Sequence, residues 1–165
     1  MAQRYRDEYA HYLNTATKTG VAENPTWVRE GTGVEALSVA FNPQVDTYKT
    51  ILQRQAQSTF NNYQMSSSIS GKRCYSEDAI YDYLDELRRT ATAGETQLLE
   101  IDTAKTNGTS GHYVAGKYDV LIIINEWLGE NATISYDINY SNPKNGYATI
   151  SGDTITFVED ADVSL

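Results

Sequence analysis

Apolar and polar side chains alternate along most of the chain, which is the pattern of strands that bury one face. The alternation is clearest in residues 133–140, where one side of the predicted strand carries Ile134, Tyr136, Ile138 and Tyr140. Shorter segments of the same kind occur at residues 35–41, 46–52, 96–102, 147–150 and 154–157. Residues 118–127 contain the apolar run 120–124 and are predicted to form a central strand covered on both faces. The chain is therefore expected to be mainly β.

Turn-forming residues separate these segments. Asn42 and Pro43 precede the strand at 46–52, and residues 142–146 read Asn-Pro-Lys-Asn-Gly. The second stretch predicts a strong turn that ends the strand at 133–140. Residues 151–153, Ser-Gly-Asp, predict a tight hairpin into the last strand.

One helix is predicted over residues 76–93. Its apolar side chains recur at helical spacing on one stripe, formed by Ile80, Tyr83, Leu84 and Leu87. Ser76 is the predicted N-cap, and Gly94 the residue that stops the helix. This stripe is expected to pack against the sheet.

A long hairpin arm is predicted around residues 45–69. Residues 53–62 are rich in Gln and Asn and have no core-facing pattern, so they are expected to form its tip. The tip supplies the candidates for contacts between subunits: Gln53, Arg54, Gln55, Gln57, Phe60, Asn61 and Asn62. Together these elements predict one domain over residues 1–165, an antiparallel β-sandwich or half-barrel with one amphipathic α-helix. The acidic C-terminal residues 159–165 are expected to fray.

The amino-acid composition excludes several classes of function. The 165 residues include 13 Lys and Arg against 22 Asp and Glu, which gives a formal net charge of −9. Such a chain does not bind nucleic-acid phosphates tightly through bulk charge. The one cysteine, Cys74, excludes a disulfide framework within the chain and fits a reducing compartment. No apolar run is long enough for a membrane span, and the N-terminal residues lack the apolar segment of a secretion signal.

The acidic and nucleophilic residues are the candidates for catalytic chemistry. Asp82, Asp85 and Glu86 lie on the predicted solvated side of the helix, so they indicate a charged face rather than a glycosidase carboxylate pair. Cys74, which follows two basic residues, is predicted to fill space before the helix. With two histidines and one cysteine, a zinc site of those ligands is implausible. The sequence predicts no catalytic residue, no cofactor and no metal, and hence no enzyme.

The order of the segments resembles a known family. Residues 27–43, residues 45–52 followed by 63–66, the helix residues 81–89 and residues 134–147 are similar, in this order, to strands and helix of the major tail tube proteins. These proteins belong to long-tailed, siphovirus-type bacteriophages, and the resemblance is to the group that infects Firmicutes. It covers most of the chain.

The resemblance implies a structural virion protein of the phage tail, assembled in the host bacterial cytoplasm. Homo-hexameric rings would stack into a tube with the tape-measure protein inside during assembly, and with the tail terminator and distal tail proteins at its ends. Double-stranded DNA would later pass through without specific binding, and no membrane would take part. In such a ring the polar side of residues 133–140 supplies the candidates for the lumen: Ser135, Asp137 and Asn139.

Three other readings stay open. One is a neighbouring tail component, such as a tail terminator or hub domain, and another is a tube from a contractile tail or a phage-derived bacteriocin. The third is a carbohydrate-binding β-sandwich module, because the 13 tyrosines could form aromatic platforms for sugars. Several of these tyrosines fall on apolar faces, which favours core or subunit contacts instead.

Overall fold

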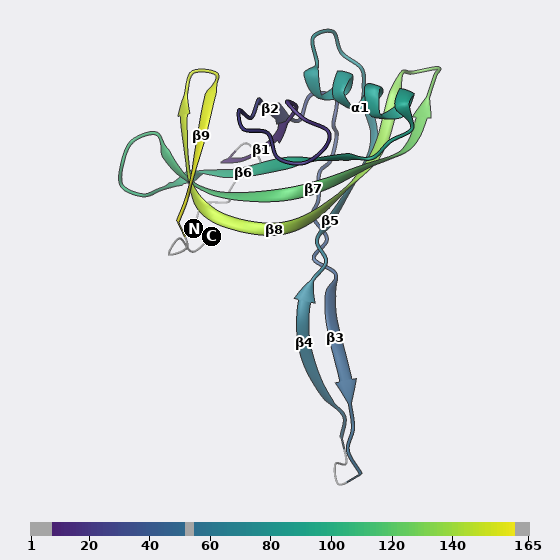
Figure 1. Cartoon of the computed structure of the whole chain (residues 1–165), viewed down its shortest axis with the longest axis vertical. Helices are drawn as coiled ribbons and strands as arrows, with labels where there is room; N and C mark the ends of the chain where they lie inside the picture. Colours follow the sequence, from purple (N-terminus) through teal and green to yellow (C-terminus); the bar gives the residue numbers. More distant parts are fainter. Residues whose placement is uncertain (1–7, 52–54, 161–165) are drawn as a thin grey trace.

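The computed structural model describes residues 8–51 and 55–160, and they form a mainly β fold with one helix (Figure 1). The strands are β1 (Tyr9–Asn14), β2 (Trp27–Glu30), β3 (Pro43–Tyr48), β4 (Gln57–Tyr63), β5 (Ser66–Arg73), β6 (Gly94–Thr106), β7 (His112–Leu128), β8 (Thr133–Ser151) and β9 (Thr154–Glu159), and the helix is α1 (Ala79–Thr90). Seven strands form one antiparallel sheet in the order β2-β1-β6-β7-β8-β5, with β9 also paired to β8. The predicted antiparallel, half-barrel-like β fold is confirmed.

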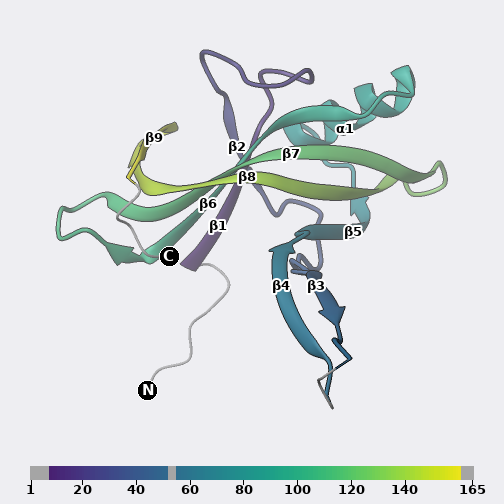
Figure 2. The ribbon, with the colours of Figure 1, turned by 60° about the horizontal axis from the view of Figure 1, so that its bottom comes forward.

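Helix α1 covers one face of this sheet (Figures 1 and 2). Ile80, Tyr83, Leu84 and Leu87 are all buried, and they pack with residues of several strands into one core. The strand residues of this core are Leu13, Ile69, Leu98, Tyr118, Val120, Ile122, Ile134, Tyr136 and Ile138. The even-numbered apolar residues of 134–138 thus face the helix.

The helix begins and ends at other residues than the sequence suggested. Asp78, not Ser76, is the N-cap, and its side chain accepts hydrogen bonds from the backbone N–H groups of Ile80 and Tyr81. Ala91 closes the helix in the left-handed conformation, with φ of 52°. Gly94 instead opens β6, where an added Cβ would lie 2.7 Å from a methyl carbon of Leu87. Gly94 is therefore needed for the close approach of strand and helix.

A second core lies on the opposite face, toward the other end of the sheet. It contains Leu99, Ile101, Ala115 and Ala148, with Ile150, Ile155 and Phe157 packed against them. The β8–β9 hairpin, predicted from residues 151–153, adds Ile155 and Phe157 to this core, because they pair with Ile150 and Ala148. Gly146 makes the packing possible, because an added Cβ would lie 2.1 Å from the carbonyl oxygen of Val158.

Strand β8 supplies both cores because it contains a β-bulge. The predicted turn at residues 142–146 is wrong: the chain continues through this stretch as one 19-residue strand. Asn142 has a φ of 48°, and the register with β7 shifts between Lys117 and Asp119. The extra residue moves the following side chains to the other face of the sheet. Ala148 and Ile150 therefore face away from the helix that Ile134 and Ile138 contact.

Two further expectations are corrected, and a third falls mostly outside the described residues. Residues 35–41 are not a strand: they contact β5 through the bridge between Ala40 and Ser66, a hydrogen bond from the Ser67 hydroxyl to the Ser38 carbonyl, and the ion pair of Glu35 with Arg73. Because β5 has a register shift between Ile69 and Lys72, a straight strand cannot follow it there. β7 is central but not covered on both faces, since Leu121 and Ile123 remain 36% and 40% exposed. The predicted fraying concerns residues 159–165, of which 161–165 lie outside the described residues.

The hairpin arm forms a sheet of its own. β3 and β4 pair only with each other, while β5 returns to the main sheet, so the arm is shorter than residues 45–69. Residues 57–62, expected in the tip, lie in β4 instead. Figures 1 and 2 both show the arm projecting away from the seven-stranded sheet.

Candidate functional site

The root of the arm has an apolar face that no other described part of the chain covers. Val45 pairs with Phe60 and Pro43 with Tyr63 across a bulge, so these side chains share one face. Tyr63 contacts both Phe41 and Phe60, with ring centroids 5.6 and 4.8 Å apart. Phe41, Val45, Phe60 and Tyr63 are all at least half exposed. We call this set of residues the aromatic face of the arm.

The opposite face of the arm is polar, and its side chains bond to each other. Asn61 donates a hydrogen bond to Asp46 at 2.7 Å, and the Tyr48 hydroxyl donates to Gln57 at 2.8 Å. This face is therefore adapted to water, whereas the aromatic face is not. The arm is two-sided, a feature that the Gln- and Asn-rich composition of residues 53–62 concealed.

The structure places most of the contact candidates on this arm. Gln53 and Arg54 lie outside the described residues. The other five are exposed and lie in or beside β4: Gln55, Gln57, Phe60, Asn61 and Asn62. Among them Phe60 belongs to the aromatic face. Sequence reasoning missed its neighbours Phe41, Val45 and Tyr63, because the alternation alone did not show that they lack a core to enter.

The lumen candidates lie together on the face of the sheet that α1 does not cover. Ser135, Asp137 and Asn139 alternate with the buried residues of β8. Asp137 is partly buried and accepts a hydrogen bond of 2.5 Å from the Ser68 hydroxyl of β5. This face is less polar than the sequence of β8 suggested, because Ile123 and Leu121 of β7 lie directly opposite Asp137 and Asn139.

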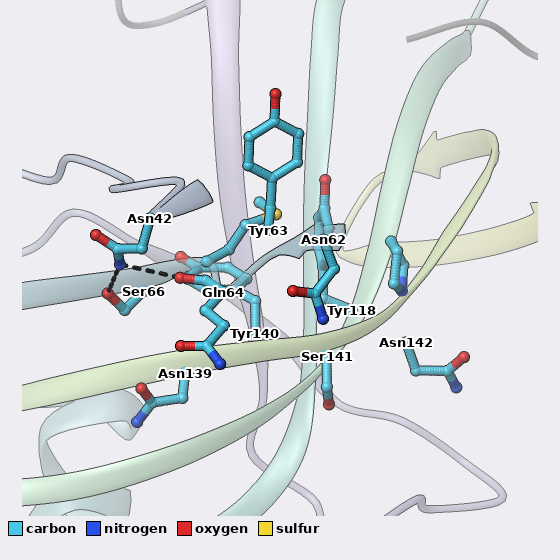
Figure 3. A pocket seen from close by; sticks show the side chains of 12 residues that line it. Asn42, Asn62, Tyr63, Gln64, Ser66, Tyr118, Asn139, Tyr140, Ser141 and Asn142 are labelled. Atoms are coloured by element: carbon cyan, nitrogen blue, oxygen red, sulfur yellow. Dashed lines mark hydrogen bonds between the residues drawn. The ribbon is translucent and has the colours of Figure 1, made fainter. Parts of the chain in front are cut away.

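A pocket lies at the root of the arm, where β4 and β5 meet β8 (Figure 3). Its walls carry three tyrosines, several amides and hydroxyls, and no charged side chain: Asn42, Asn62, Tyr63, Gln64, Met65, Ser66, Tyr118, Asn139, Tyr140, Ser141, Asn142 and Pro143. Asn42 fixes one wall by donating hydrogen bonds to Gln64 and Ser66. Burial raises the pKa of Tyr140 to about 12, so this hydroxyl stays protonated at neutral pH.

A buried ion cluster was not predicted from the sequence. Lys72, only 1% exposed, lies 2.9 Å from Asp78 and 3.4 Å from Glu30, and it also donates to the carbonyl of Thr32. Burial raises the pKa of Glu30, although the ammonium of Lys72 acts in the opposite direction. Tyr136 is buried beside Glu30, and burial raises its pKa well above the usual value. The cluster joins β2, β5 and the start of α1, so it acts in stability.

The remaining candidates form no site. Arg88 and Arg89 bind Asp85, and although burial acts to raise the pKa of this carboxyl, their hydrogen bonds hold it below its usual value. Cys74 is exposed, so the prediction that it fills space is wrong. The described residues bring together no group of three His, Cys, Asp or Glu side chains suited to a metal ion. Nor does this part of the chain contain a helix long and apolar enough to cross a membrane.

No established family profile matches the sequence, and no curated protein matches it. Among solved structures, the chain is similar to a chain in the cryo-EM structure of the anti-feeding prophage (AFP) baseplate, 6-fold symmetrised. The two are 9% identical with a TM-score of 0.48, and the match covers 88% of this chain and 95% of the other. The function must therefore be argued from the geometry of the chain itself.

Proposed function

We propose that this protein is the repeating subunit of a phage-type tail tube, in which hexameric rings stack into the conduit for DNA ejection. The tape-measure protein would occupy the tube during assembly, and the tail terminator and distal tail proteins would close its ends. The ordered segments that resemble tail tube proteins support this assignment. The resemblance is also the reason for proposing six subunits in each ring. The observation that carries the proposal is the two-sided arm.

The arm has the properties of a contact element. A two-stranded hairpin without a packed face is marginally stable in water. Here all seven residues of β4 are exposed, and the aromatic face lies open to solvent. Contiguous exposed apolar residues of this kind mark an interaction site. Because the arm projects away from the seven-stranded sheet of the same molecule, another molecule must cover it.

The sheet edges offer a route to ring closure. Within the described residues, β2 and β9 each pair on one side only, so their other backbone edges are open. Open edges are templates for pairing with a neighbouring chain. Contacts between different edges of successive copies are head-to-tail, and they generate rings when the rotation closes.

The part of the uncovered face that β8 supplies around Ser135 and Asp137 would line the channel. Helix α1 covers the opposite face, and Ser135, Asp137 and Asn139 are small and polar or acidic. The net charge of −9 fits a wall along which phosphates slide without binding, because like charges prevent counterion release.

Electron microscopy of the purified protein tests the proposal. We expect tubes of uniform diameter at high protein concentration. The matched variant replaces residues 45–61 by Asn-Gly, which closes a two-residue hairpin between the paired residues Gln44 and Asn62. This variant should fold but form no tubes. A protein that stays monomeric across a wide concentration range, or a truncated variant that assembles normally, contradicts the proposal.

Two other functions give different results in the same experiments. A tail terminator or hub would form isolated rings that do not stack. A carbohydrate-binding module is favoured by the uncharged pocket at the arm root, because tyrosines and amides suit a sugar (Figure 3). Binding on a glycan array that is lost in Asn42→Ala, without tube formation, would support the module.

A further inference from the structure

The arm differs in charge from the rest of this acidic protein. Residues 41–65 contain two basic residues, Lys49 and Arg54, and one acidic residue, Asp46, whereas the whole chain carries −9. Asp46 is bonded to Asn61. Lys49 is exposed and forms no ion pair with any residue that the structure describes. The outer part of the arm is thus a positive element on a negative molecule.

The outer part of the arm also carries a fully exposed apolar side chain. Ile51, two residues after Lys49, is 103% exposed. An isoleucine in full contact with water is stabilised when an apolar surface buries it. Lys49 and Ile51 together therefore predict a receiving surface that is apolar at its floor and acidic at its rim.

One groove on the body has this character. It is lined by Gly20, Val21, Glu95, Thr96, Asp119, Val120, Leu121 and Ser141, and we call it the acidic groove. Val21 and Leu121 are exposed apolar residues, and no basic residue lines the groove. Three other pockets formed by described residues fit less well: the pocket at the arm root is uncharged, another contains Arg88, and a third contains Arg73 paired with Glu35.

The rim of the acidic groove has a free negative charge. Asp119 already accepts hydrogen bonds from Gln97 and Asn142. Glu95 is exposed and forms no ion pair among the described residues. Lys18, whose carbonyl accepts the backbone N–H of Glu95, turns its ammonium away to Glu86, 2.7 Å distant. The carboxylate of Glu95 is therefore available to a partner.

We propose that the arm of one copy docks in the acidic groove of a second copy, with Ile51 on Val21 and Leu121 and Lys49 beside Glu95. This inference rests on the proposed function, for which it names the receiving surface of the arm. The arm projects away from the seven-stranded sheet of the same molecule, so the contact forms between molecules (Figures 1 and 2). Each copy donates one arm and offers one groove, and such a contact propagates from copy to copy.

Disulfide trapping tests the contact directly. In a Cys74→Ser background, Ile51→Cys and Leu121→Cys are introduced together, and the protein is oxidised mildly at assembly concentration. The docked arm should yield a ladder of covalent multimers on a non-reducing gel, because the two Cα atoms must approach within about 7 Å. Each single-cysteine variant can give dimers at most. A double variant without a ladder overturns the inference, whether or not tubes form.

Charge reversal provides a second test. Lys49→Glu and Glu95→Lys should each raise the concentration needed for assembly about two- to fivefold per contact, as for an exposed ion pair. The double variant should recover most of this loss. Lys105→Glu and Glu130→Lys are matched controls of equal charge change, and they should have no such coupling. Additive effects in the double variant overturn the assignment of this pair.

The outcomes separate this inference from the proposed function. Tubes without a ladder mean that the arm docks elsewhere while the tube assignment stands. A ladder without tubes means that the docking is right and the tube assignment is wrong. If neither forms, both are wrong.

Discussion

Lys72 Nζ lies 2.9 Å from Asp78 Oδ2, and both side chains are almost completely buried. The same carboxyl group caps α1 through its other oxygen, which accepts two backbone hydrogen bonds. Glu30 of β2 lies 3.4 Å from the same ammonium. One lysine therefore holds the start of the helix, an edge strand of the sheet and β5 together.

Removing this lysine should destabilise the subunit strongly. Lys72→Ala leaves two buried carboxyl groups without their cation, and breaking a buried pair in this way costs about 3–5 kcal/mol. Urea unfolding under conditions that keep the protein monomeric measures the loss. Lys105→Ala, at an exposed lysine, should change the free energy of unfolding by less than about 0.5 kcal/mol. Equal midpoints for the two variants would show that the cluster contributes nothing.

Glu30 should make the subunit less stable as the pH rises. Its pKa in the folded chain is raised by burial above the unfolded value, so the folded state binds the proton more tightly. The resulting stabilisation is fully present below the unfolded pKa and is lost as the pH rises through the folded pKa. Glu30→Gln removes this dependence and leaves Lys72 paired with Asp78 beside Tyr136.

Melting temperatures across pH test this dependence. The wild-type protein should lose stability relative to Glu30→Gln as the pH is raised from about 4 to neutrality. The comparison isolates the contribution of Glu30 and its cluster, because carboxyl groups elsewhere in the chain titrate equally in both proteins. Parallel curves, or a relative gain by the wild-type protein, would contradict the prediction.

Leu84→Asp should unfold or severely weaken the subunit. Leu84 has no exposed surface and lies at the centre of the stripe that α1 packs on the sheet. A charge placed there costs several kcal/mol, on the order of 3 or more. Asp82→Ala, on the exposed side of the same helix, is the control. The melting temperatures of both variants test this prediction. A Leu84→Asp protein that melts at the same temperature as its parent would contradict it.

Asp137→Lys should leave assembly intact and slow the passage of DNA. The substitution loses one hydrogen bond from Ser68 but touches no core residue. If Asp137 lines the channel, each ring gains several favourable phosphate contacts, so ejection should slow most at low salt. Glu130→Lys at the tip of the β7–β8 hairpin is the matched control. Ejection kinetics equal to those of the control, or a map with Asp137 on the outer wall, would refute the channel assignment.

Strong local periodicity made much of the fold predictable. The alternation in residues 133–140 and the helical stripe from Ile80 to Leu87 each depend on the chemistry of one segment, and one partner surface is enough to bury them. The exposed arm was predictable for a related reason, because residues 53–62 have no core-facing pattern. Its two faces were not, since they depend on the pairing of Val45 with Phe60 and of Pro43 with Tyr63.

Features decided by pairing partners could not be found in this way. Asn-Pro-Lys-Asn-Gly suits a turn and a β-bulge equally, and only the long ladder with β7 makes it a bulge. Lys72 points inward because Gly71, with a φ of 67°, accompanies the register shift in β5. A strict alternation carried on from Ile69 would have sent position 72 outward. The buried cluster was therefore invisible in the sequence.

The bulge at Asn142 also limits how this chain can change in length. Successive side chains along a strand point to opposite faces of the sheet. The extra residue of the bulge reverses this alternation once, between the two cores. Losing one residue between Ser141 and Lys144 would remove the bulge, keep Lys144 paired with Lys117 and leave Ala148 and Ile150 on their present side of the sheet. Losing two would leave β8 one residue short against β7 and turn Ala148 and Ile150 toward the other side. Mutational drift in this stretch should therefore accept substitutions, and the loss of one residue, far more readily than the loss of two.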